Sequence, residues 1–365
     1  MIMENLSFKF FISGEEKEIV PGTELWELPL SGRKSNQADG RKDSNLINPD
    51  KSDKEITTGD YFRAAVAFLS KQDCAALTKG LELFFQYSLT KSHIKNVSVF
   101  LEKHGAFYHP MKILVKLNNS DSCCFVLNGA VSSQGMSLIE AEYQLISKLN
   151  SVFLKQYLPQ VYAMDFIETP KANIAFFLGE WFEGYKEFHI TRDQGKRQIA
   201  LWEGDGTCQY ISEHQALPVY KKISKILTYY YNVETFEQIF PWHHAAGDFI
   251  VKEEKDGFKV RLITARGYYP LTEFSPDENQ DENQRKDHIL PSLLMFFINL
   301  SLKIRVDRLN GLGEYTLLSD KIIEAALEGF LEALNEKPDE KPGERLGEKT
   351  GNYNYGDLKN IFIGF

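Results

Sequence analysis

The residues best suited to chemistry gather in one stretch, Pro241-Trp-His-His-Ala-Ala-Gly-Asp-Phe-Ile-Val251. It brings two imidazoles, His243 and His244, near the carboxylate of Asp248 in the sequence. Histidine is a general base near neutral pH, and carboxylate oxygens are good ligands for hard cations. The stretch is therefore a candidate for proton transfer or for cation binding.

The same stretch ends in a pattern that is typical of a β-hairpin. Phe249-Ile-Val251 is apolar, a short charged turn follows, and Lys259-Val-Arg-Leu-Ile-Thr-Ala-Arg-Gly267 returns. Two short runs rich in β-branched residues on either side of a charged turn predict paired strands. We therefore expect a polar loop that leads into a hairpin over residues 241–267.

Upstream of this loop the pattern alternates between strand-like and helical runs. A helix is expected where Leu138, Ala141, Leu145 and Leu149 form one apolar face. Strand-like runs precede and follow it. The expected strands are 97–101, 111–117 and 123–127 before the helix, and 161–167 and 174–178 after it, with a connector at 179–184.

The rest of the chain is expected to be mainly helical, apart from the hairpin. Apolar spacing predicts helices over 211–231, around 290–304, and from Ser319 onward, where the serine can cap the first turn. The expected divisions are 1–94, an N-terminal extension with a mobile loop at 31–57 and helices; 95–184, a sheet with one helix; 185–334, a helical part with the hairpin; and 335–365, a flexible tail with an apolar end.

Composition narrows the class of partner. The chain has 365 residues and a formal net charge of −9, so a broad basic surface for nucleic acid is not expected. No apolar run reaches the about 20 residues of a membrane-spanning helix. The N-terminus has no basic segment followed by an apolar one, as a signal peptide would. We expect a cytoplasmic protein without nucleic-acid or membrane partners, and the sequence leaves the oligomeric state open.

The order of elements resembles the two-lobed protein-kinase-like superfamily, and within it the aminoglycoside-phosphotransferase-like, small-molecule kinase branch. The resemblance covers residues 95–334 and leaves the first 94 outside. It implies an α+β fold, in which a small antiparallel sheet with one inserted helix is followed by a mainly helical C-terminal lobe. It also implies ATP and Mg²⁺ as cofactors, with a nucleotide or another small-molecule ligand bound in the cleft between the lobes.

The resemblance assigns roles in the first lobe. In this family a lysine on the third strand contacts the nucleotide phosphates and is held by a glutamate of the inserted helix. Asn128 takes the place of that lysine, and Glu142 fits the glutamate better than Glu140 does. Glu180 and Trp181 fall on the connector, where the family receives the adenine.

The resemblance also assigns roles in the second lobe. The branch has a His-Gly-Asp-x-x-x-x-Asn pattern followed by an apolar strand. Aligned on Phe249–Val251, it puts His243 on the base and Asp248 on the magnesium ligand. Thr264 falls on the second metal-binding aspartate, and Arg266 follows as a candidate anion-binding residue. A second alignment takes Gly247-Asp248 as the Gly-Asp of the pattern and puts Glu253 on the asparagine.

Three functions follow as hypotheses. The first is a divergent kinase-like protein that binds a nucleotide or small ligand and retains residual or altered phosphotransferase activity through His243 and Asp248. The second is a catalytically inactive pseudokinase that acts as a binding or regulatory module, because the lysine and the second metal-binding aspartate are absent. The third is a metal-dependent hydrolase or transferase on the same frame, with His243, His244 and Asp248 as ligands.

Overall fold

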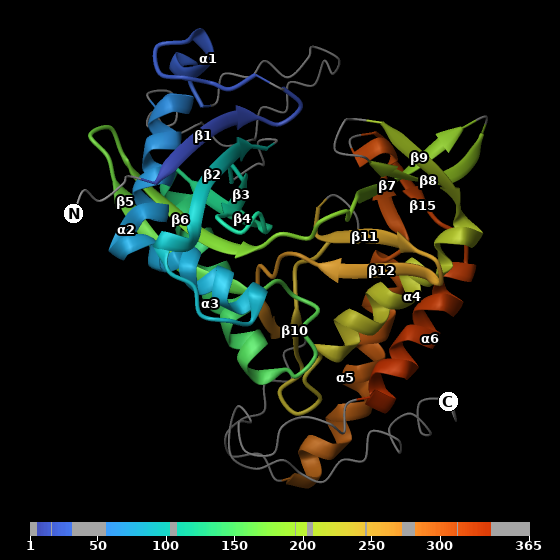
Figure 1. Ribbon diagram of the computed structural model, residues 1–365. Coiled ribbons are helices and arrows are strands. Elements are labelled where there is room, and N and C mark those ends of the chain that lie inside the picture. The colour runs from blue at the N-terminus through green and yellow to red at the C-terminus, as the bar shows by residue number, and fades with distance from the viewer. Residues whose placement is uncertain are drawn as a thin grey trace. The chain divides into compact units, whose positions relative to one another are not determined.

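A computed structural model describes residues 6–15, 17–30, 56–102, 108–193, 195–202, 207–244, 247–271, 282–311 and 313–336. These residues form two compact units (Figure 1). Unit 1 comprises Met1–Tyr143 and Gln160–Glu183, and unit 2 comprises Gln144–Pro159 and Gly184–Phe365. The chain is of mixed α+β class, as expected. Most of the expected loop at 31–57 and nearly all of the tail at 335–365 lie outside the described residues.

Unit 1 is built on one six-stranded sheet with the strand order β1-β2-β3-β4-β6-β5. All neighbours pair antiparallel except β1 and β2, which run parallel. The last five strands reproduce the predicted sequence of three strands, a helix and two strands. The strands are β1 (Ser7–Ile12), β2 (Ile94–Leu101), β3 (Met111–Leu117), β4 (Ser122–Ala130), β5 (Val161–Glu168) and β6 (Asn173–Glu180).

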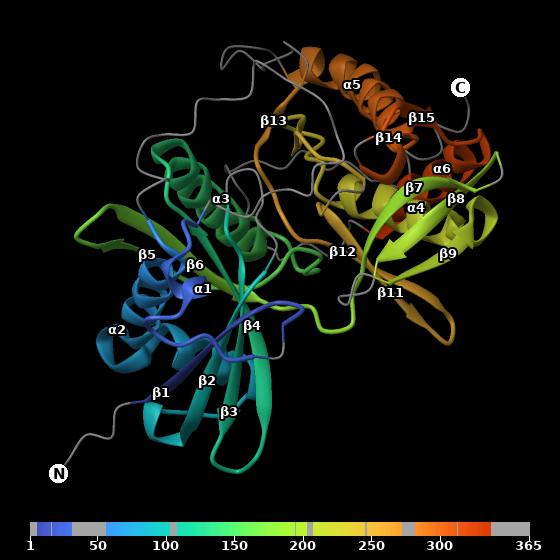
Figure 2. The same cartoon turned by 90° about the horizontal axis from the view of Figure 1, so that it is seen from above.

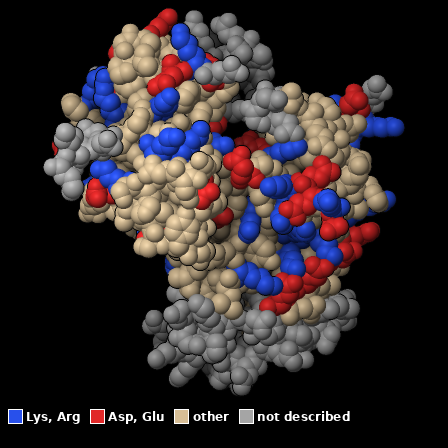
Figure 3. All heavy atoms as spheres, in the orientation of Figure 1, with Lys and Arg blue, Asp and Glu red and all other residues tan. Residues whose placement is uncertain are grey.

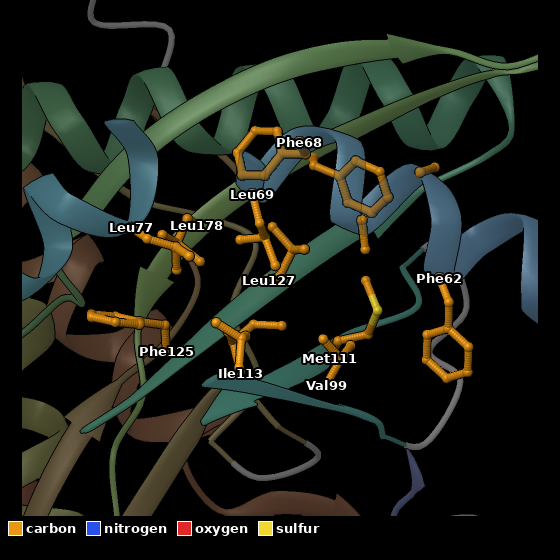
Figure 4. Close-up of a cluster of buried hydrophobic side chains, with 14 of the residues drawn as sticks. Phe62, Phe68, Leu69, Leu77, Val99, Met111, Ile113, Phe125, Leu127 and Leu178 are labelled. Atoms are coloured by element: carbon orange, nitrogen blue, oxygen red, sulfur yellow. The ribbon is translucent and has the colours of Figure 1, made fainter. Parts of the chain in front are cut away.

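One face of this sheet packs against α2 (Thr58–Phe85), which follows the short helix α1 (Glu24–Glu27) and precedes the turn η2 (Lys91–His93). Figure 2 shows β1 to β4 side by side and α2 along the sheet. Alternate residues of the strands face this helix, because side chains along a strand point to opposite faces. Figure 4 shows ten of the side chains in this core: Phe62, Phe68, Leu69, Leu77, Val99, Met111, Ile113, Phe125, Leu127 and Leu178.

The first 94 residues therefore do not form a separate extension, since β1 and α2 complete the core of unit 1. The other face of the sheet carries a smaller cluster of Ala130, Ile139, Ala175 and Phe177, in which Ile139 comes from α3 (Ser133–Val152). Helix α3 crosses the division between the units, which falls after Tyr143.

Unit 2 contains more strands than the sequence predicted. A three-stranded antiparallel sheet and several two-stranded pairs accompany the helices. The strands are β7 (Glu187–Asp193), β8 (Lys196–Trp202), β9 (Cys208–Ser212), β10 (Glu237–Ile239), β11 (Phe249–Glu254), β12 (Gly257–Leu262), β13 (Tyr268–Pro270), β14 (Val306–Arg308) and β15 (Tyr315–Leu317). The helices are α4 (Glu213–Tyr229), α5 (Glu282–Lys303), the turn η3 (Leu309–Gly311) and α6 (Lys321–Glu336).

The prediction of a mainly helical second half was thus wrong for residues 187–212. Strand β7 alternates in burial, with Phe188 and Ile190 inside, and β8 buries Ile199, Ala200 and Leu201. These runs are short, and their charged neighbours conceal the alternation. The helices expected over 211–231, 290–304 and from Ser319 match α4, α5 and α6. Among the described residues, no helix is long and apolar enough to cross a membrane.

Helices α4 and α6 pack closely in unit 2. A Cβ atom on Gly329 of α6 would lie 1.9 Å from the carbonyl oxygen of Lys221 in α4, so only glycine fits at this crossing. Nearby, the buried hydroxyl of Ser224 donates a hydrogen bond of 2.6 Å to the carbonyl of Ala326. Helix α4 begins with a capping box, in which Ser212 and Gln215 exchange hydrogen bonds.

Candidate functional site

The predicted loop and hairpin are present in unit 2. Strands β11 and β12 pair antiparallel, with Phe249 opposite Leu262. The amide of Ile263 donates to the carbonyl of Asp248 at 2.9 Å, which continues the pairing by one residue. Asp248 and Thr264 therefore lie at the same end of the hairpin.

Asp248 is engaged by protein groups. Its side chain is 1% exposed, and both carboxylate oxygens accept hydrogen bonds from the guanidinium of Arg266, one of them at 2.7 Å. The backbone amide of His243 donates to the Oδ2 atom of Asp248 at 2.7 Å. Such a bidentate, charge-assisted pair is the strongest kind of hydrogen bond in proteins. Arg266, expected to bind an anionic ligand, instead holds the carboxylate expected to bind a metal.

A second buried carboxylate, Asp307 on β14, lies among three imidazoles. His243 Nε2 is 3.6 Å from its Oδ1 atom, and the nearest nitrogens of His189 and His244 are each 3.9 Å from its Oδ2 atom. Two backbone amides fix the carboxylate, those of Ile190 at 3.2 Å and Arg308 at 2.7 Å. Asp307 can therefore orient an imidazole and stabilise it in its charged form.

The two adjacent histidines lie on the same side of the chain. A strictly extended segment would point them in opposite directions, but the backbone bends at His244. Their rings are nearly parallel, with an interplanar angle of 16° and centroids 5.3 Å apart. The side chain of His243 is 43% exposed, whereas that of His244 is fully buried. Only His243 of this pair is therefore open to a ligand.

His244 is held in its neutral form. Burial lowers its pKa to about 3, and the neighbouring charges of His243 and His189 act in the same direction. The nearby backbone of Lys303 opposes this lowering of the pKa. Around the ring lie Phe188 at 6.2 Å and Tyr220 at 5.5 Å between centroids. His244 is therefore a packed core histidine and no acid or base in the physiological range.

The residues predicted for the nucleotide phosphates lie in unit 1. Asn128 is on β4 opposite Phe177 and is partly exposed, on the face that also carries Ala130. Glu142 is on α3 and is 4% exposed. Asn128 lies on the sheet face against which α3 packs, and Glu142 lies on α3 itself. Helix α3 follows β4 along the chain, and its Glu142 is buried and not solvated.

The connector residues form a network of their own. The Nε1 atom of Trp181 donates to Glu183 at 3.0 Å, and Lys112 of β3 donates to the same oxygen at 3.2 Å. The Lys112 ammonium also lies 5.0 Å from the centroid of the Trp181 ring, within cation–π distance. Glu180 accepts a hydrogen bond from the amide of Gln160 at 3.1 Å. Trp181 and Glu180, the residues expected to receive an adenine, are thus each hydrogen-bonded to other protein groups.

The expected site residues therefore fall into two groups. His243, Asp248, Thr264 and Arg266 come together in unit 2, and Asn128, Glu142, Glu180 and Trp181 belong to unit 1. Within the described ranges, no group of three or more His, Cys, Asp or Glu side chains is arranged to hold a metal ion.

Sequence reasoning missed Asp307, His189 and Lys112. Asp307 lies in Val306-Asp-Arg308, which matches no known sequence motif. Nothing in the sequence indicates that this single aspartate is buried. Compared with models of known protein families and with curated proteins, the chain matches none.

Proposed function

We propose that this chain is a kinase-like protein that has lost metal-dependent phosphotransfer and acts as a binding or regulatory module. The order of strands in unit 1 supports the kinase-like part of the proposal. The strands run β2, β3, β4, then α3, then the hairpin β5–β6, with β6 beside β4. The polar loop and the hairpin β11–β12 support it in unit 2.

The proposed loss of activity rests on the salt bridge between Asp248 and Arg266. A magnesium ligand must offer a free oxygen lone pair to the cation. Here Arg266 binds both oxygens of Asp248, and Thr264 offers only a hydroxyl where the family has a second carboxylate. A guanidinium is charged at all physiological pH values and so competes with a cation permanently. The contacts among Lys112, Trp181 and Glu183 support a loss of adenine binding, because they engage the Trp181 side chain that the resemblance assigns to the adenine.

Thermal-shift measurements with ATP, ADP and GTP, each with and without Mg²⁺ or Mn²⁺, test the proposal. Ligands that bind only the folded state raise its stability by about 2.7 kcal/mol at a hundredfold excess over Kd. We expect no metal-dependent shift with any of the three nucleotides. A shift that requires both nucleotide and metal would overturn the proposal.

The variant Arg266→Ala sharpens this test. It leaves the Asp248 carboxylate without its guanidinium, so a weak Mg²⁺-dependent shift is expected to appear. Arg261→Ala is the matched control, because Arg261 lies on the same hairpin and donates to the carbonyl of Gln156 instead. Equal Mg²⁺-dependent shifts in the two variants would show that Arg266 does not keep the cation away from Asp248.

The exposed His243 favours a second candidate, a divergent kinase-like enzyme with altered phosphotransfer. In it His243 takes the proton of an acceptor hydroxyl while Asp307, 3.6 Å from its Nε2 atom, stabilises the imidazolium. Release of ADP from ATP in the presence of small hydroxyl compounds, lost in His243→Ala, would support this candidate over the inactive module. Absence of release in the unaltered protein excludes it for the compounds offered.

A further inference from the structure

The middle of helix α5 is apolar on all sides. Residues 289–302 cover almost four turns and contain no charged side chain, although 25% of the whole chain is charged. Figure 3 shows, by contrast, Lys, Arg, Asp and Glu side chains crowded over the part of unit 2 where Figure 1 labels α4 and α6. A surface helix usually keeps one charged face, and a helix that is apolar all round is usually buried. Helix α5 therefore has the sequence of a helix that is covered on two sides.

One side of α5 is covered by other parts of unit 2. Phe296 and Phe297 pack against Phe330 of α6, with ring centroids 6.3 Å and 4.9 Å apart. The ring of Phe296 also lies 4.4 Å from that of Tyr231, which follows α4. Leu293, one turn before Phe296 and Phe297, is 0% exposed. This side of the helix is therefore part of the core of unit 2.

The opposite side of α5 carries exposed aliphatic side chains. Leu294, Ile298 and Leu302 lie on successive turns, and Met295 lies beside them; we call these four residues the α5 stripe. The exposed fractions of Leu294, Met295, Ile298 and Leu302 are 46%, 51%, 41% and 56%. Apolar surface left in water costs about 25 cal/mol for each Å² that packing would have removed. A contiguous apolar patch of this kind marks a surface that binds another segment or protein.

The chain itself contains a segment suited to the α5 stripe. Residues 358–365 read Leu-Lys-Asn-Ile-Phe-Ile-Gly-Phe, which is the apolar part of the expected tail, and they lie outside the described residues. Their bulky apolar side chains include the i, i+3, i+4 and i+7 positions Leu358, Ile361, Phe362 and Phe365. This is the spacing with which an amphipathic helix anchors in an apolar groove. The spacing suits a stripe that also repeats once per helical turn.

We propose that residues 358–365 bind the α5 stripe of the same chain and bury it. Helix α6, which packs against α5, ends at Glu336, so residues 337–357 connect the two partners. As a coil, these 21 residues span about 25 Å, at roughly 5–6 Å × √n for n residues. The stripe from Leu294 to Leu302 is about 12 Å long, at about 1.5 Å per residue. The connection is therefore long enough for the segment to reach the whole stripe.

The connection also favours the same chain over a second copy. A short linker gives a tethered segment an effective concentration in the millimolar range. A second copy at micromolar protein concentration therefore competes poorly for the stripe. While residues 358–365 are bound, the stripe is closed to other apolar partners. The contact does not involve Asp248 or Arg266, so it is independent of the function proposed above.

Photo-crosslinking in the full chain tests the proposal. Benzoyl-phenylalanine replaces Phe362, and peptide mass spectrometry locates the crosslink in an equal mixture of unlabelled chains and chains labelled with heavy nitrogen. We expect crosslinks to residues 289–302 in at least about fivefold higher yield than from Asn360, which lies on the other side of the expected helix. The two crosslinked peptides should carry the same label. Differently labelled pairs would place a second copy on the stripe, and a yield no higher than from Asn360 would exclude the contact, so either result overturns the proposal.

A pair of leucine variants separates docking from folding. Leu294→Lys puts an ammonium on the stripe and should lower the crosslink yield from position 362 at least about threefold, because a charge is costly to bury in an apolar contact. Leu83→Lys is the matched control, since Leu83 of α2 is 48% exposed against 46% for Leu294. It should leave the yield unchanged, and both variants should keep the circular dichroism spectrum of the unaltered chain. The same yield in the two variants would show that the stripe is not the binding surface.

Discussion

Asp248 and Asp307 are buried carboxylates of unit 2 with opposite kinds of partner. Asp248 is bound by a guanidinium that is charged at every relevant pH, whereas Asp307 faces the imidazoles of His189, His243 and His244. The first pair is therefore structural and permanent. The second arrangement reaches the surface through His243, whose side chain is 43% exposed.

Replacing Asp248 by Asn tests the structural role of the first pair. The change removes the carboxylate but keeps its size, so that Arg266 loses a bidentate partner. We expect the free energy of unfolding, measured in urea, to fall by about 2 kcal/mol. The loss should stay below the 3–5 kcal/mol of a fully buried pair, because Arg266 is 46% exposed.

The exposed pair Arg192–Glu314 provides the control for this variant. Its charged atoms are 3.5 Å apart, and the two side chains are 44% and 70% exposed. Glu314→Gln should therefore change the unfolding free energy by less than about 1 kcal/mol. Similar losses in both variants would mean that the Asp248 pair contributes no more than a surface contact.

His244 makes stability depend on pH in a defined direction. Its pKa is lowered from 6.5 to about 3 in the folded protein, so the unfolded chain binds one more proton between these values. Stability is retained above pH 6.5 and is lost as pH falls below it, by up to about 1.4 kcal/mol per pH unit. His244→Phe should weaken this loss between pH 6.5 and 5 in urea unfolding. The exposed His93 of unit 1, changed to Gln, should leave it unaltered.

At the residue level the sequence identified the loop but not its electrostatics. His243, Asp248 and Thr264 could be placed because a hairpin fixes the register of the residues beside it. The pairing of Asp248 with Arg266 could not be predicted, because β13 and the end of β12 set the position of Arg266 through non-local contacts. Asp307 is separated from His243 by helix α5, so no local pattern connects the two.

At the level of elements, the contact of α4 with α6 depends on one glycine. Gly329→Ala adds a methyl group that would meet the Lys221 carbonyl at 1.9 Å, and the backbones must move apart. We expect a loss of at least about 2 kcal/mol in unfolding free energy, although alanine is the better helix former. Glu328→Ala, at the position of α6 just before Gly329, is the control and should lower the unfolding free energy far less. Unchanged or increased stability in Gly329→Ala would contradict the packing.

Helices were predicted better than strands for a physical reason. The apolar faces of α4 and α6 repeat over four turns or more, which makes their periodicity easy to detect. Strands β10, β13, β14 and β15 have three residues each, too few for an alternation to stand out. Such short strands exist because tertiary contacts place their backbones side by side.

At the level of the whole molecule, residues 144–159 belong to unit 2 although they precede the last strands of unit 1. Tyr229 and Tyr230 of unit 2 accept hydrogen bonds from the amides of Lys155 and Leu158, and the ring of Phe153 packs 4.9 Å from that of Tyr230. The second half of α3 and the loop after it thus complete the core around α4. A division at the connector alone, as the sequence predicted, separates these residues from their partners.

Two fragments test this division. A chain of residues 144–365 should unfold cooperatively in urea, followed by circular dichroism. A chain of residues 184–365 should show a broad transition with a smaller slope, because buried aromatic rings and tyrosine hydroxyls lose their partners. If the shorter chain unfolds as cooperatively and at the same urea concentration as the longer one, residues 144–159 do not belong to that unit.

The parallel pairing of β1 with β2 has a consequence for synthesis in the cell. Strand β1 leaves the ribosome before its partner, because Ser7 pairs with Asn96 and β2 emerges only after α2. Until then Phe8, Phe10 and Ile12 have neither a strand partner nor the sheet core to pack against. Contacts between such distant residues form slowly, and an unpaired apolar strand invites association with other nascent chains. Strand β1 is therefore a segment that chaperones should bind during translation.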